Sequence, residues 1–114
     1  MPDFFRGVTL DRGLIPPKNA EDYQKITDFL ETTANVKEKY PDIALVVDAL
    51  HKDGRTKLSA VGYCWGSKMV TLAGATNAFE AVASIHPSYL TVDDAKDFKV
   101  PISLYLSKDE SDEE

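Results

Sequence analysis

The sequence predicts an α/β fold in three layers, with helices on both faces of a mostly parallel sheet. Two short apolar runs, residues 81–85 and 102–106, have the length and composition of strands that are buried on both faces. Segments with the apolar spacing of helices alternate with strand-like runs, as in folds whose parallel strands are joined by right-handed crossovers. In sheets of this kind, ligands bind at the carboxyl ends of the strands.

Two helices are predicted in the first half of the chain. Asn19 can cap a helix that begins at Ala20, because its side chain can accept a hydrogen bond from the first turn. Pro41 suits the first position of a second helix, which the Asp53-Gly54 turn ends. Apolar side chains recur along one face of each helix, at Tyr23, Ile26, Phe29 and Leu30 in the first and at Ile43, Val46, Val47 and Leu50 in the second.

The strongest functional signal lies between a predicted strand at residues 57–63 and a predicted helix that runs to about Ala73. The joining segment contains the motif Gly62-Tyr63-Cys64-Trp65-Gly66, in which glycines stand two residues to either side of a cysteine. Such glycines allow a strand to turn sharply into a helix, and we expect a Cβ at either position to collide with the crossing strand or helix. The turn leaves the central side chain exposed at the top of the sheet.

Cys64 is therefore a candidate nucleophile, and it is the only cysteine in the chain. A thiol at a helix N-terminus faces the positive end of the helix dipole, which favours the reactive thiolate. The alternative is a buried structural thiol, generally the commoner role of a lone cysteine. The paired glycines at a strand-to-helix junction favour the nucleophile.

Composition excludes several classes of protein. A chain of 114 residues, 43% of them apolar, fits one domain with a compact core. A net charge of −6, without a basic stripe, argues against nucleic acid and membrane surfaces as partners. The sequence contains neither a secretory signal pattern nor an apolar run of the roughly 20 residues that span a bilayer, so we expect a cytoplasmic protein. We expect no cofactor and no metal ion.

The cysteine motif resembles the nucleophile segment of the dienelactone hydrolase family, the cysteine-using branch of the α/β-hydrolases. Three further segments resemble the family in the family's own order, namely residues 1–7, Ile85-His86-Pro87-Ser88 and residues 101–109. The resemblance implies an incomplete α/β-hydrolase fold, in which residues 1–114 form part of one domain. It also implies hydrolysis of a small-molecule ester or lactone through an acyl-enzyme on Cys64.

The resemblance implies roles for further residues. The backbone N–H of Trp65 would be an oxyanion donor, and Asp109 matches the family's catalytic acid. Asp109 can also be read as the first residue of a solvated acidic tail. Arg6 matches an arginine that binds the substrate carboxylate, but the segment before it is one residue shorter than in some members, and a surface role is equally open.

The two histidines have separate interpretations. His86 ends a predicted strand, so we expect it at the rim of the substrate pocket. Its alternatives are the catalytic base, or a structural histidine held by hydrogen bonds. His51 lies near a helix end and is interpreted as a partner of the helix dipole.

The expected catalytic histidine is missing from the sequence. In the family it follows the acid along the chain, but only five residues follow Asp109 and none is histidine. The first strands, with one oxyanion donor, are also expected upstream of this sequence. We therefore expect a truncated domain that is weak or inactive by itself. The alternatives are a non-catalytic chain that associates with other chains, including copies of itself through exposed sheet edges, and a redox-sensitive thiol protein.

Overall fold

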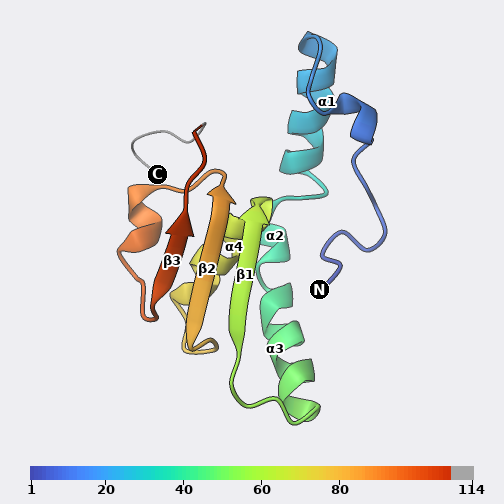
Figure 1. The fold of residues 1–114 in the computed structure, drawn as a ribbon. Coiled ribbons are helices and arrows are strands. Elements are labelled where there is room, and N and C mark those ends of the chain that lie inside the picture. The colour runs from blue at the N-terminus through green and yellow to red at the C-terminus, as the bar shows by residue number, and fades with distance from the viewer. Residues whose placement is uncertain (109–114) are drawn as a thin grey trace. The chain divides into compact units, whose positions relative to one another are not determined.

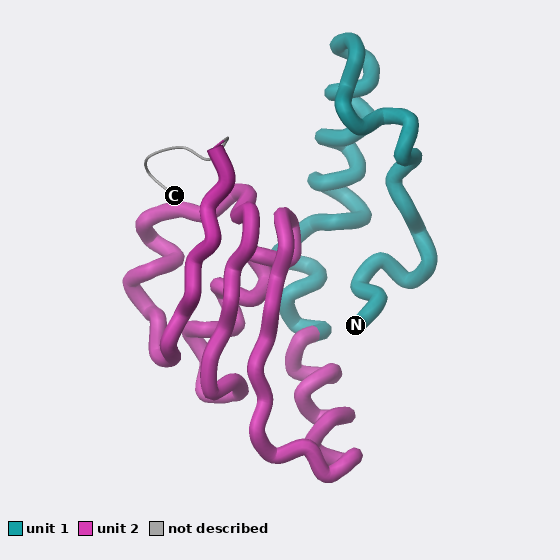
Figure 2. The backbone as a smooth tube through the Cα atoms, viewed as in Figure 1, with its two compact units in different colours: residues 1–42 teal, residues 43–114 magenta. Residues whose placement is uncertain are grey.

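The computed structural model of the chain describes residues 1–108. The chain divides into two compact units, residues 1–42 and residues 43–114 (Figure 2). Among the described helices there is none with the length and apolar character needed to cross a bilayer.

Unit 1 is helical. It contains the short 3-10 helix η1 (Arg12–Leu14), α1 (Ala20–Glu31) and α2 (Val36–Lys39). The predicted cap of α1 is confirmed, because the Asn19 side chain accepts a 2.9 Å hydrogen bond from the backbone N–H of Asp22. The rings of Phe5 and Phe29 pack edge to face, with their centroids 5.5 Å apart. Neither η1 nor α2 was predicted from the sequence.

Unit 2 carries the sheet. Its helices are α3 (Asp42–Lys52), whose first residue belongs to unit 1, α4 (Trp65–Gly74) and the 3-10 helix η2 (Val92–Ala95). Its strands are β1 (Ser59–Cys64), β2 (Ala81–Pro87) and β3 (Ile102–Tyr105), which pair in parallel in the order β1-β2-β3 (Figure 1). The prediction of an α/β fold with a parallel sheet is confirmed. The predicted bounds of α3, α4 and the strands agree with the observed ones to within two residues.

The core of unit 2 forms where α4 packs on β1 and β2. Met69, Val70 and Ala73 of α4 are buried, as is Val82 of β2. The predicted apolar stripe of α3 is confirmed, since Val47 is buried and its neighbours Ile43, Val46 and Leu50 are partly buried. His51 lies in the last turn of α3, where a histidine can interact favourably with the helix dipole.

The opposite face of this sheet carries exposed side chains. Gly62 and Ser84 lie in register and face α4, so their neighbours Tyr63, Ile85 and Tyr105 point to the other side, where they form one row across the three strands. Tyr63 is 65% exposed and Tyr105 is 59% exposed. The expectation that residues 102–106 are buried on both faces is therefore wrong for the described residues, because β3 lies at the edge of the sheet.

Candidate active site

Cys64 adopts the backbone conformation of a sharp turn between strand and helix. It is the last residue of β1 and directly precedes α4, with φ = 50° and ψ = −116°. A positive φ is rare for a residue with a Cβ, and such strained residues cluster at functional sites. The side chain is exposed and the thiol is free. The expected placement of the sulfur, at the carboxyl end of a strand and outside the core, is therefore observed.

The two glycines of the motif have different roles. A Cβ on Gly62 would lie 2.1 Å from the carbonyl oxygen of Gly66, so that the strand and the first turn of α4 leave no room for a side chain there. A Cβ on Gly66 would meet no atom within 4 Å outside the helix's own backbone. The expectation of a collision is confirmed at Gly62 and wrong at Gly66, because only Gly62 lies at the point where the two elements cross.

Two buried hydroxyls hold the elements together beneath this turn. Ser67 and Ser84 are both completely buried. The Ser67 hydroxyl shares its single proton between the carbonyl oxygens of Gly62 (3.0 Å) and Ile85 (3.1 Å). Ser84 donates in turn to the Ser67 oxygen at 2.9 Å. One side chain of α4 therefore joins the ends of β1 and β2, next to the candidate nucleophile.

The end of β2 is irregular and turns towards Cys64. Tyr63 pairs with Ile85, but Cys64 pairs with Pro87, so His86 is an additional residue in β2. His86 has a φ of 48°, which places it in the left-handed region. Past this bulge, the Ser88 hydroxyl oxygen lies 3.3 Å from the Cys64 sulfur. The carboxyl ends of two strands thus bring a thiol and a hydroxyl into contact.

His86 lies at the predicted strand end, and its side chain is exposed. Its ring nitrogen Nδ1 lies 3.2 Å from the hydroxyl oxygen of Ser107, which follows β3. This contact links the ends of β2 and β3 and is of the kind expected for the alternative of a structural histidine held by hydrogen bonds. The role of His86 in substrate binding stays a prediction.

The other predicted site residues fall in three places. Trp65 is the first residue of α4, directly after Cys64, as its predicted role as oxyanion donor requires. Asp109 lies outside the described residues. Arg6 belongs to unit 1, where its guanidinium forms a 3.3 Å ion pair with Asp42 and where its side chain is 74% exposed. The predicted functions of these three residues stay predictions.

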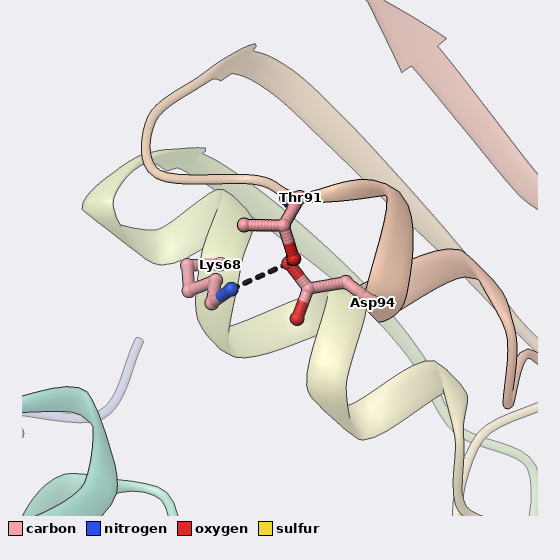
Figure 3. A network of polar contacts seen from close by, with 3 residues as sticks. All are labelled: Lys68, Thr91 and Asp94. Atoms are coloured by element: carbon pink, nitrogen blue, oxygen red, sulfur yellow. Dashed lines mark hydrogen bonds and ion pairs between the residues drawn. The ribbon is translucent and has the colours of Figure 1, made fainter. Parts of the chain in front are cut away.

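A partly buried ion pair joins the first turns of α4 to η2 (Figure 3). Lys68 Nζ lies 2.5 Å from Asp94 Oδ2, and the two side chains are 16% and 11% exposed. Burial acts to raise the pKa of Asp94, but hydrogen bonds from Lys68 and from the backbone and hydroxyl of Thr91 outweigh it and lower this pKa below its ordinary value. The ionised pair fixes the chain that follows Ser88 to α4.

Four serines of this region carry no role in the sequence-based prediction. They are Ser67, Ser84, Ser88 and Ser107. Ser84 could have been identified from the sequence, because it is a polar residue within the apolar run 81–85 and therefore requires a buried hydrogen-bond partner. The contacts of Ser88 and Ser107 depend on the bulge at His86 and on strand order, which have no local signal in the sequence.

Comparison with curated proteins gives relatives that are much longer than this chain. Two uncharacterized AIM2 family proteins of Schizosaccharomyces pombe are 34% identical over 112 residues and 31% identical over 116 residues. These matches cover 96% and 100% of this chain but 45% and 47% of the relatives. An endo-1,3;1,4-beta-D-glucanase of Zea mays is 35% identical over 104 residues, which are 91% of this chain and 30% of the maize protein. No solved structure is significantly similar to the chain.

The family assignment comes from a profile that matches nearly the whole sequence. The profile of the dienelactone hydrolase family aligns with residues 1–113, which include the glycine-flanked cysteine and the three strands. The chain therefore belongs to the dienelactone hydrolase family.

Proposed function

We propose that the chain contributes the nucleophile for hydrolysis of a carboxylic ester or lactone, with Cys64 forming the acyl-enzyme. The observation that carries this proposal is the positive φ of Cys64 in an exposed turn between β1 and α4. The strained backbone at this point lowers the stability of the fold, and packing alone does not explain why the strain is present. The strain is explained if this turn serves to expose a nucleophile to substrate.

The proposed reaction has two steps. The Cys64 thiolate attacks the acyl carbon, and the bond from this carbon to the alkoxy oxygen breaks. The alkoxide takes up a proton from solvent, and it leaves as the alcohol from an ester or stays attached to the acyl group from a lactone. Water then attacks the thioester carbon and gives up one proton to solvent, the carbon–sulfur bond breaks, the carboxylic acid leaves and the Cys64 thiolate is regenerated. The Trp65 N–H would donate a hydrogen bond to the oxyanion in both steps. No described residue is assigned as the base that activates the water or as the second oxyanion donor. Asp109 lies outside the described residues, so it is given no role in these steps.

The maize relative's name raises glycoside hydrolysis as a second candidate. That chemistry generally uses two carboxyl groups on either side of the scissile bond. The side chains described above at the carboxyl ends of the strands are instead a thiol, hydroxyls and an imidazole, from Cys64, Ser88, Ser107 and His86. This set favours acyl transfer. Release of reducing ends from a mixed-linkage β-glucan, undiminished by Cys64→Ala, would favour the glycosidase.

An activated ester tests the acyl-enzyme directly. The full chain is mixed with 4-nitrophenyl acetate, whose leaving group departs as an anion and needs no general acid. Formation of 4-nitrophenolate and the gain of one acetyl group by the intact protein are followed in time. We expect stoichiometric acetylation that Cys64→Ala abolishes; a wild-type chain that gains no acetyl group, or a Cys64→Ala variant that gains it equally fast, would contradict the proposal.

We also propose that the chain associates with a second copy of itself, in addition to the proposed hydrolysis. Two observations favour it: the row of Tyr63, Ile85 and Tyr105, in which both tyrosines are exposed, and the outer edge of β1, which pairs with no other strand among residues 1–108. Apolar faces and open strand edges promote contact between identical chains. Light scattering over a range of concentrations tests it.

A further inference from the structure

The side chains of Cys64 and Ser88 are in contact at the carboxyl ends of β1 and β2. The two side-chain atoms lie 3.3 Å apart, within reach of a hydrogen bond that involves sulfur. With a neutral thiol, either group can be the donor. With the thiolate, only the serine hydroxyl can donate, because the sulfur carries no proton.

The backbone around this contact is unusual on both sides. Cys64 has a φ of 50°, and His86 and Tyr89, which bracket Pro87 and Ser88, have φ values of 48° and 63°. Pro87 pairs with Cys64 in the strand register and is buried. It therefore holds in place the segment that carries Ser88. Three strained residues therefore surround one contact, which is the distribution expected at a functional site rather than in a connecting loop.

The segment that carries Ser88 is also anchored from its other end. The Thr91 backbone and hydroxyl both donate to Asp94 Oδ2, and Asp94 pairs with Lys68 of α4. Lys68 lies one turn along the helix that begins directly after Cys64. Both ends of this short segment are thus tied to the elements that position the sulfur, so the 3.3 Å contact is held by structure on both sides.

We propose that Ser88 is a further catalytic residue, whose hydroxyl donates a hydrogen bond to the Cys64 sulfur and orients it for attack on the acyl carbon. This inference rests on the proposed acyl-enzyme function. The bond is charge-assisted while the sulfur is anionic, so it holds the sulfur in one direction until the carbon–sulfur bond forms. Ser88 transfers no proton in this step; it restricts the sulfur to one orientation.

The test compares acetylation of Cys64 by 4-nitrophenyl acetate in the full chain and in Ser88 variants. Loss of the fixed orientation of the sulfur predicts that Ser88→Ala slows the pseudo-first-order acetylation rate by about tenfold. Ser88→Thr keeps the hydroxyl and should restore the rate to within about threefold, whereas Ser88→Val has the same shape without the hydroxyl and should remain slow. Ser103→Ala, an exposed serine in the middle of β3, is the control and should leave the rate unchanged.

The Thr and Val variants keep the test decisive if Ser88→Ala does not fold. A Ser88→Val rate equal to that of Ser88→Thr would overturn the inference, whether both rates are fast or slow, because the hydroxyl would then have no effect. A wild-type chain that gains no acetyl group would contradict the proposed function instead. A Ser88→Ala variant that is acetylated as fast as the wild type would overturn the role of Ser88 and leave the acyl-enzyme proposal intact.

Discussion

Ser84 of β2 donates a 2.9 Å hydrogen bond to Ser67 of α4, and both residues are completely buried. Ser67 in turn donates to carbonyl oxygens of both β1 and β2. This pair is the polar connection between the helix and the two strands whose ends carry Cys64 and Ser88. A buried polar group without a partner is costly, so Ser84 requires Ser67 as its acceptor, whereas Ser67 also has the two carbonyl oxygens.

The first prediction concerns this pair. Ser67→Ala should lower the free energy of unfolding by about 1–3 kcal/mol, because it leaves the Ser84 hydroxyl buried without its acceptor. The double variant Ser67→Ala with Ser84→Ala should cost less than the sum of the two single variants, since neither hydroxyl is then left unpaired. Urea denaturation measures all three.

Thr71→Val is the matched control for the serine pair. Thr71 lies one turn further along α4, and its buried hydroxyl oxygen has no hydrogen-bond partner. Removal of this hydroxyl should leave stability unchanged or raise it. If Ser67→Ala were as harmless as Thr71→Val, the bridging role of Ser67 would be wrong.

The second prediction separates the two glycines of the motif. Gly62→Ala should prevent folding or cost more than about 4 kcal/mol, because its Cβ would lie 2.1 Å from the Gly66 carbonyl oxygen. Gly66→Ala should be neutral or stabilise the chain by up to about 1 kcal/mol, since alanine is the better helix former. Circular dichroism and thermal melting distinguish the two, and similar melting temperatures would contradict the crossing geometry.

The third prediction concerns the strain at Cys64. Cys64→Gly should raise the free energy of unfolding by about 1 kcal/mol, because glycine adopts φ = 50° without the steric cost of a Cβ. Cys64→Ala retains the Cβ and should match the wild type to within about 0.5 kcal/mol. A Cys64→Gly variant that is less stable than Cys64→Ala in urea would show that the turn is not strained.

The fourth prediction is a pH dependence from Asp94. Its pKa is lowered on folding, so its contribution to stability is present above the pKa of the unfolded chain and is lost as the pH falls through the folded-state pKa. At pH 7, Asp94→Asn should cost about 2 kcal/mol, because Lys68 would remain partly buried without its counterion. Between pH 7 and pH 3, the wild type should lose more stability than the variant.

Asp93→Asn is the control for this measurement. Asp93 pairs with Lys96 in the same region, but both side chains are largely exposed. Such a pair contributes little, so the substitution should change the unfolding free energy by less than about 0.5 kcal/mol at any pH. Equal effects of Asp93→Asn and Asp94→Asn would refute the special role of the Lys68–Asp94 pair.

The fifth prediction tests association. Tyr63→Ser with Tyr105→Ser removes the two exposed aromatic rings from the sheet row and should reduce concentration-dependent scattering. Tyr23→Ser removes a comparably exposed ring, 62% accessible, from α1 and should leave the scattering unchanged. A chain that remains monomeric at all concentrations would rule out self-association by this face.

Much of the local structure was predictable because its causes are local. Asn19 caps α1 through a hydrogen bond within its own turn, and the α3 stripe follows from residues three and four apart. The β1–Cys64–α4 turn was predictable for the same reason, since Gly62 and Cys64 lie within one short motif. The exposure of β3 was not predictable, because burial depends on which strand lies at the edge of the sheet.

By itself, the sequence determined that a cysteine stands at a sharp turn from a parallel strand into a helix, and it identified the family. Only the tertiary structure decided which side chain meets the sulfur, because Ser88 lies 24 residues away and approaches through a bulge at His86. The structure also decided that Gly62, and not Gly66, is the glycine without room for a side chain. Contacts between distant segments depend on register and crossing geometry, which no short stretch of sequence encodes.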